Sequence, residues 1–261
     1  VTQMGHIWKQ RNDIFISQGE QGLEEFYQKE ILFAVDNLER DSTLVRLMKN
    51  YSDEELFNDP ILQELNQLAL SYSNVEGNLL YEHPLKSMSD SFNVAFYEKR
   101  YNLFQLAKSR TKILEIGFNA GHSLLLMLTA NPDIESLSFD LNFHAYTRPC
   151  FDFLKRYFPK IDIRFGDSRE EVANYCNENP KKFDMIHVDG SHDVNFAAID
   201  YENVKKLATQ DTIVVFDDAS RGSPLYDFLQ LKFACNEIRS VDRDELGLKS
   251  TSLHEIFTFI R

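Results

Sequence analysis

The sequence predicts an α/β protein in which a doubly wound, mostly parallel sheet follows an N-terminal helical extension. Beyond residue 111, short apolar and β-branched runs alternate with longer segments of helical period, which is typical of a parallel sheet with helices on both faces. The first run leads through a turn containing Gly117 and Gly121 into the first helical segment. With 261 residues, 43% of them hydrophobic, the chain can form one large domain and an appendage.

Residues 1–108 are predicted to form the helical extension, either as packing helices or as a lid or dimer interface. Ser52 and Glu55 have capping-box spacing, and Asp59–Pro60 is typical of another helix start. A helical stripe of apolar residues precedes them, formed by Leu23, Phe26, Tyr27, Ile31, Ala34, Val35 and Leu38.

Gly77 and Pro84 mark a loop ahead of the main domain. Its Tyr81, His83 and Lys86 either close over a ligand or belong to a connection whose aromatic residues are core. A helix through residues 97–106 follows the loop.

The main domain is expected to span residues 109–261. Five strands are predicted near 111–116, 135–140, 161–165, 183–188 and 212–217. Helices are predicted near 121–130, 146–157, 169–178, 194–208 and 223–232, and two last strands near 235–241 and 252–260.

The composition restricts the possible partners and compartments. A net charge of −13 argues against nucleic acid, because binding its backbone requires clustered cations. Cys150, Cys176 and Cys235 are widely spaced, which predicts buried thiols in a reducing compartment instead of disulfides or a zinc site. No apolar run reaches membrane-spanning length and no signal-peptide pattern is present, so we expect a soluble cytoplasmic protein without membrane contact.

Acidic residues follow the first three predicted strands, at the sheet edge where open α/β folds bind ligands. Glu115 ends the first strand, and Asp140 ends the second, where it can accept ribose hydroxyls or cap a helix. Asp167 and Ser168 follow the third strand and can cap the next helix. The turn lacks the G-x-G-x-x-G spacing of dinucleotide-binding proteins, which disfavours a nicotinamide dehydrogenase.

Three further acids, Asp189, Asp217 and Asp218, follow the fourth and fifth strands. Two carboxylates about 4 Å apart repel by roughly 4 kcal/mol at an effective dielectric constant near 20, so the group needs a cation or a proton. Hard oxygen ligands without a nearby cysteine cluster favour Mg²⁺, with Ca²⁺ or Mn²⁺ as alternatives. The alternative is that Asp217 and Asp218 cap a turn while Asp189 contacts a ligand.

Three histidines lie near these strand ends. His192 follows the fourth strand and is either a general base or a structural hydrogen-bonding residue. His187, in the middle of that strand, is expected in the core. His122 is expected to line the cleft beside the glycine turn.

Residues 112–123, 137–140, 166–168, 186–192 and 213–218 together resemble the motifs of class I S-adenosylmethionine-dependent methyltransferases. The resemblance covers about residues 76–261 and implies a Rossmann-like, seven-stranded sheet whose last strand is antiparallel. It implies S-adenosylmethionine as methyl donor, with the ribose bound by Asp140 and the adenine by Asp167 and Ser168. The implied cofactor turn and its neighbours are Glu115, Gly117, Phe118, Asn119, Gly121, His122, Ser123 and Asp189.

Within this superfamily, the acids resemble those of metal-dependent O-methyltransferases, which implies Mg²⁺ on Asp189, Asp217 and Asp218. Sugar O-methyltransferases of that branch usually carry Asp-x-Asp after the fourth strand, whereas this chain has Asp189-Gly190-Ser191-His192.

We therefore expect S-adenosylmethionine-dependent O-methylation of a small hydroxylated acceptor, with Asp189 and His192 at the reacting groups and a divalent metal assisting. The alternatives are a metal-free methyltransferase with His192 as base, and a non-catalytic cofactor-binding module. The N-terminal helices are the expected surface for any homo-oligomer.

Overall fold

The computed structural model describes residues 46–178 and 180–260. The chain divides into two compact units, residues 1–49 and 50–261. Residues 50–108 therefore belong to the same unit as the sheet, and no division falls at the predicted boundary after residue 108. The predicted helical stripe from Leu23 to Leu38 lies outside the described residues.

Two short helices near the start of the larger unit begin where the sequence predicts. α3 (Asp53–Phe57) is capped by Ser52, whose hydroxyl accepts the N–H of Glu55 at 3.2 Å. α4 (Pro60–Tyr72) is capped by Asp59, and Pro60 occupies its first turn. A 3₁₀ turn, η1 (Val94–Phe96), leads into α5 (Tyr97–Ala107).

Within the described residues, seven strands form one sheet in the order β3-β2-β1-β4-β5-β7-β6. β1 to β5 are mutually parallel, and β7 lies between β5 and β6, antiparallel to both. This arrangement confirms the predicted Rossmann-like sheet. The strands are β1 (Lys112–Ile116), β2 (Glu135–Asp140), β3 (Ile161–Phe165), β4 (Met185–Val188), β5 (Ile213–Asp217), β6 (Ile238–Ser240) and β7 (His254–Phe259).

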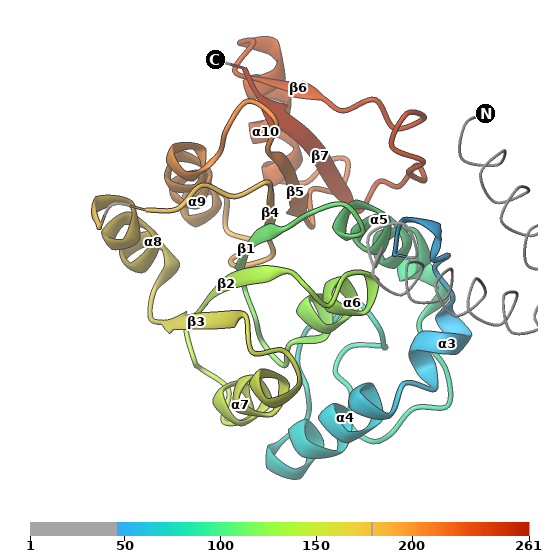
Figure 1. Ribbon diagram of the computed structural model, residues 1–261. Helices are drawn as coiled ribbons and strands as arrows, with labels where there is room; N and C mark the ends of the chain where they lie inside the picture. The colour runs from blue at the N-terminus through green and yellow to red at the C-terminus, as the bar shows by residue number, and fades with distance from the viewer. Residues whose placement is uncertain (1–45, 179, 261) are drawn as a thin grey trace, which may run out of the picture. The chain divides into compact units, whose positions relative to one another are not determined.

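Helices cover both faces of the sheet (Figure 1). One core joins the sheet to α4, α5, α6 (His122–Ala130) and α7 (Thr147–Tyr157). The other joins it to α8 (Ser168–Asn177), α9 (Val194–Leu207) and α10 (Pro224–Ala234). Along β1, Ile113 belongs to the first core and Leu114 to the second, as the alternation of side chains along a strand requires.

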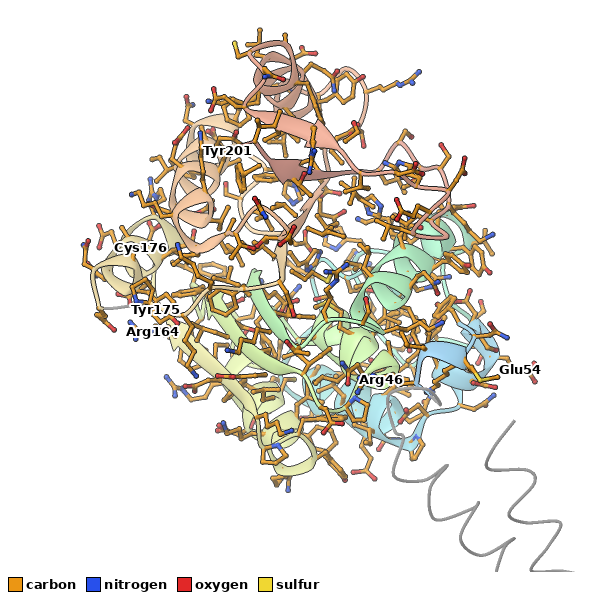
Figure 2. All side chains as sticks on the ribbon, turned by 45° about the horizontal axis from the view of Figure 1, so that its top comes forward. Arg46, Glu54, Arg164, Tyr175, Cys176 and Tyr201 are labelled. Carbon is orange, nitrogen blue, oxygen red and sulfur yellow. The ribbon has the colours of Figure 1, made fainter. Side chains whose placement is uncertain are left out.

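The three cysteines are free thiols, as predicted. Their predicted burial is correct only for Cys150, because Cys176 on α8 is half-buried and Cys235, just after α10, is exposed. Figure 2 shows Cys176 on α8, with Tyr201 on the neighbouring α9. Among the helices of the described residues, none is both long and apolar enough to span a membrane.

Candidate active site

The glycine turn between β1 and α6 requires both of its glycines. Gly117 has φ +94°, and a Cβ there would lie 2.0 Å from the carbonyl oxygen of Asp189 at the end of β4. Gly121 has φ +83°, and a Cβ there would meet the Phe118 ring at 2.6 Å and Leu154 at 2.8 Å. A side chain would therefore strain the backbone and also push the turn away from β4 and α7.

A cleft of about 380 Å³ opens at the carboxyl ends of β1, β4 and β5. Its walls come from the glycine turn, from the loop after α4 and from the start of α5. Most of the predicted site residues lie on it. Its lining comprises Gly77, Asn78, Leu79, His83, Phe96, Lys99, Gly117, Phe118, Asn119, Ala120, His122, Ser123, Asp189, Gly190, His192, Asp217 and Asp218.

Glu115 lies beneath the glycine turn. It is not one of the described residues that line the cleft. Its side chain is fully buried and accepts hydrogen bonds from Ser123 at 2.7 Å and Ser138 at 3.0 Å. His187, also buried, places its Nδ1 3.4 Å from the same carboxylate. Glu115 therefore joins β1, β2, β4 and α6, and the predicted core position of His187 is explained by this contact.

Asp140 holds the glycine turn in position from the end of β2. Its two carboxylate oxygens accept the N–H groups of Asn119 and Asn142, each at 2.7 Å. Burial raises the pKa of Asp140, and the two N–H groups oppose the shift. Each oxygen retains a lone pair for a further donor.

Asn119 also connects the turn to the loop after α4. Its side-chain amide donates to the carbonyl oxygens of Glu76 and Gly77, and its Oδ1 accepts the hydroxyl of Tyr146 at 2.7 Å. The loop that starts at Glu76 is thereby fixed at the mouth of the cleft.

Asp167 and Ser168 lie at the start of α8, away from the cleft lining. Asp167 is the N-cap, because its side chain accepts the N–H of Arg169 at 3.0 Å. It also forms an ion pair with the Arg169 guanidinium, which lowers the pKa of Asp167. The capping interpretation is confirmed for Asp167, and adenine contact by Asp167 and Ser168 stays a prediction.

The acids after β4 and β5 come together as the sequence predicts. One ligand atom from each of His187, Asp189 and Asp217 lies within 4.8 Å of the others, and the same holds for Asp189, His192 and Asp218. His192 places its Nε2 2.9 Å from Asp218 Oδ2, while 65% of the His192 side chain remains exposed.

Lys99, which the sequence interpretation missed, enters this group of acids from α5. Its Nζ lies 2.5 Å from Asp217 Oδ2 and 3.4 Å from Asp218 Oδ1, and only 7% of its side chain is exposed. The sequence does contain a signal for this position, because the spacing of Lys99, Leu103 and Leu106 places all three on the same face of a helix. A lysine in such a stripe requires a buried partner.

The charged side chains at the ends of β4 and β5 alter the pKa values of their neighbours. Burial by itself lowers the pKa of Lys99, but Asp217, Asp189 and Asp218 outweigh burial and raise it. Burial and the charge of Asp217 raise the pKa of Asp189. The hydrogen bond between His192 and Asp218 raises the pKa of the histidine and lowers that of the acid to about 2.

His122 lines the cleft as predicted but is almost fully buried. Its Nε2 lies 2.8 Å from Asn66 Oδ1 on α4, and burial lowers its pKa to about 4. His122 is therefore a neutral residue that connects α6 to α4.

Comparisons with known proteins agree with this geometry. Residues 114–219, from β1 to just past β5, match a family model described as a methyltransferase domain. The structure is similar to an O-methyltransferase from Bacillus cereus in complex with S-adenosylhomocysteine, with 17% identity, a TM-score of 0.54 and coverage of 77% of this chain and 89% of that one. A comparison of the sequence with curated proteins found no match.

Two other solved structures share the fold. The O-methyltransferase TomG from Streptomyces achromogenes, in complex with S-adenosylmethionine, has 16% identity and a TM-score of 0.51 over 77% of this chain and 88% of that one. The TDP-rhamnose 3′-O-methyltransferase CalS11 has 19% identity and a TM-score of 0.50 over 82% of this chain and 98% of that one.

The domain match identifies residues 114–219 as a methyltransferase domain, and the sheet order and the glycine turn give it the Rossmann-like fold of the O-methyltransferases to which it is similar.

Proposed function

We propose that the chain transfers a methyl group to a hydroxyl oxygen of a small acceptor. The observation that carries this proposal is the His192–Asp218 pair, hydrogen-bonded at 2.9 Å and placed in the same cleft as the glycine turn. The cleft volume of about 380 Å³ lies in the range of small-molecule sites. The O-methyltransferases with the same fold, at 16–19% identity, are consistent with oxygen as the target but do not identify the acceptor.

The residues at the glycine turn suit S-adenosylmethionine. Asp140 has lone pairs left for two ribose hydroxyls, and Phe118, Asn119 and Ser123 line the cleft next to it. When bound, the cofactor supplies a methyl group on a positively charged sulfur. The remaining task of the protein is to orient the acceptor hydroxyl and to remove its proton.

His192 is the proposed base. Its Nε2 faces Asp218, so a hydrogen on Nε2 leaves the Nδ1 lone pair free to take the acceptor proton. The carboxylate of Asp218 then stabilises the imidazolium that forms. Asp189 lies beside this pair and is proposed to contact the reacting groups.

The residues do not fit the expected Mg²⁺ as long as Lys99 is in place. The three acids offer suitable oxygens, but Asp217 and Asp218 already bind the Lys99 ammonium. A divalent cation about 4 Å from that ammonium would be repelled by roughly 8 kcal/mol at an effective dielectric constant near 20. We therefore favour the metal-free form of the reaction, and we expect turnover to persist in excess chelator.

The cofactor assignment predicts that Asp140→Ala weakens S-adenosylmethionine binding by about 100-fold or more, because each of the two hydrogen bonds to this charged group contributes about 1.5–3 kcal/mol. Calorimetric titration measures the affinity. Asp162→Ala, an exposed acid on β3, is the matched control and should bind like the wild type. Retained affinity in Asp140→Ala would refute the assignment.

The base assignment predicts that His192→Gln lowers turnover by about 10²- to 10⁴-fold, the usual contribution of a positioned base, and leaves S-adenosylmethionine affinity unchanged. The measurement is S-adenosylhomocysteine formation across a panel of hydroxylated compounds. Asp218→Asn should show a smaller loss in the same direction. Undiminished turnover in His192→Gln contradicts the assignment, and binding without consumption by any compound would favour the non-catalytic module.

A further inference from the structure

Lys99 is a buried cation on the wall of the cleft. Only 7% of its side chain is exposed. Its Nζ lies 2.5 Å from Asp217, the last residue of β5, and 3.4 Å from Asp218, the next residue. A lysine ammonium has three N–H donors. Asp217 and Asp218 take two of them, which leaves one donor for a molecule in the cleft that Lys99 lines.

Among the described residues, each of the two groups of potential metal ligands includes an acid that Lys99 already binds. The first group contains Asp217 and the second contains Asp218, while Asp189 belongs to both. A divalent ion in either group would therefore compete directly with the ammonium.

The backbone that carries Lys99 is anchored on its other side. The next residue, Arg100, is fully buried and donates to Asp53 at 2.6 Å and to the carbonyl oxygens of Leu79 and Asn93 at 3.2 and 2.8 Å. Two residues further along α5, Asn102 donates to the carbonyl oxygen of Lys249 at 2.9 Å. These bonds fix α5, so the ammonium is held at the acids and is unlike a mobile surface lysine.

We propose that Lys99 is the resident cation of the acceptor site: it balances the acids, keeps divalent metals out, and donates its third N–H to the acceptor oxygen. Only the last part of this inference, the hydrogen bond to the acceptor oxygen, rests on the proposed O-methylation. An ammonium donates hydrogen bonds and places a positive charge near the oxygen that loses its proton, which is the stabilisation that a metal would otherwise supply.

The metal part is tested by titrating the full-length protein with Mn²⁺ alone, followed by electron paramagnetic resonance. The wild type should bind none at the acids up to millimolar concentration. Lys99→Met should bind one Mn²⁺ at least tenfold more tightly, and Lys99→Met combined with Asp218→Asn should lose it again. Lys108→Met is the matched control, because Lys108 directly follows the same helix and is similarly buried, and it should behave like the wild type.

Two outcomes overturn the metal part: one equivalent of Mn²⁺ on the wild type with the same affinity in Lys99→Met, or no binding by Lys99→Met. Lys99→Gln is measured in parallel, because it keeps polar atoms near the acids if Lys99→Met folds poorly. The wild-type titration is decisive without either variant, since stoichiometric binding there refutes the exclusion of metal. None of these Mn²⁺ titrations requires turnover, so their outcome does not depend on whether the proposed function is correct.

The acceptor part is tested by kinetics with a compound from the panel that is turned over. Lys99→Gln should raise the acceptor KM at least tenfold and leave the S-adenosylmethionine Kd unchanged, and Lys99→Arg should recover part of the loss. An unchanged acceptor KM in Lys99→Gln would show that the lysine does not hold the acceptor.

Discussion

Asp200 is a carboxylate that the fold keeps almost completely from solvent. It lies on α9 with 1% of its surface exposed, beneath Gly190, whose Cβ position is 3.6 Å from one of its oxygens. Burial raises its pKa to about 6. Asp200 therefore reduces the stability of the protein at neutral pH.

Replacing Asp200 gives a pH-dependent prediction. Between its unfolded pKa near 3.8 and its folded pKa near 6, the folded state holds a proton that the unfolded state releases, so the free energy of unfolding falls as the pH rises through this range. The full loss, up to about 3 kcal/mol, persists above pH 6. Asp200→Asn should be more stable than the wild type at pH 8 and nearly equal to it at pH 4.

Urea unfolding at the two pH values measures this difference. Asp211→Asn, at an exposed acid, is the control and should give the same difference from the wild type at both. A constant effect of Asp200→Asn from pH 4 to pH 8 would show that its carboxylate is not destabilised by burial.

Among the elements, the loop from Val75 to Leu85 is closed by hydrogen bonds within the loop and is attached to the glycine turn by further hydrogen bonds. Val75 and Leu85 exchange two backbone hydrogen bonds of 2.9 Å, and His83 accepts the N–H of Gly77 at 2.6 Å. The Tyr146 hydroxyl accepts the N–H of Glu76 at 3.2 Å and donates to Asn119. Because Gly77 and His83 line the cleft, opening this loop would widen it.

Tyr146→Phe should loosen the loop without disturbing the sheet. It removes two hydrogen bonds of about 1 kcal/mol each, so amide hydrogen exchange in residues 76–85 should accelerate by roughly tenfold or more. Tyr157→Phe is the control, since Tyr157 is half exposed at the end of the same helix. Unchanged exchange in the loop would mean that its own bonds suffice to hold it.

Elements of the sheet domain could be predicted closely because their signals are local. The bounds of β2 and β3 agree with the predicted ranges, and α6 to α9 begin and end within one residue of theirs. The predicted strand near 235–241 shortens to Ile238–Ser240, because α10 continues to Ala234 and Asn236 adopts a left-handed turn with φ +57°. The apolar residues before that turn fit the pattern of a helix as well as that of a strand.

At the scale of the whole molecule, topology explains which parts of the site were predictable. Asp189, Asp217 and Asp218 lie at the carboxyl ends of parallel neighbouring strands, so their meeting at one edge follows from the strand order. Lys99 comes from a helix before the sheet, and no local pattern states which strand end that helix covers. Glu115 is the residue before the last of β1, and the alternation along the strand directs it toward Ser123 and away from the cleft.

The position of β7 has a consequence for synthesis on the ribosome. β7 is made after β6 yet lies between β6 and β5, where His254 pairs with Asp217. Until residues 254–259 emerge, the nascent chain therefore presents an open edge on β5, beside the very acids that hold Lys99. The sheet is complete only after β7 has covered that edge, so a ribosome stalled earlier would carry an intermediate with an exposed strand edge, which chaperones bind.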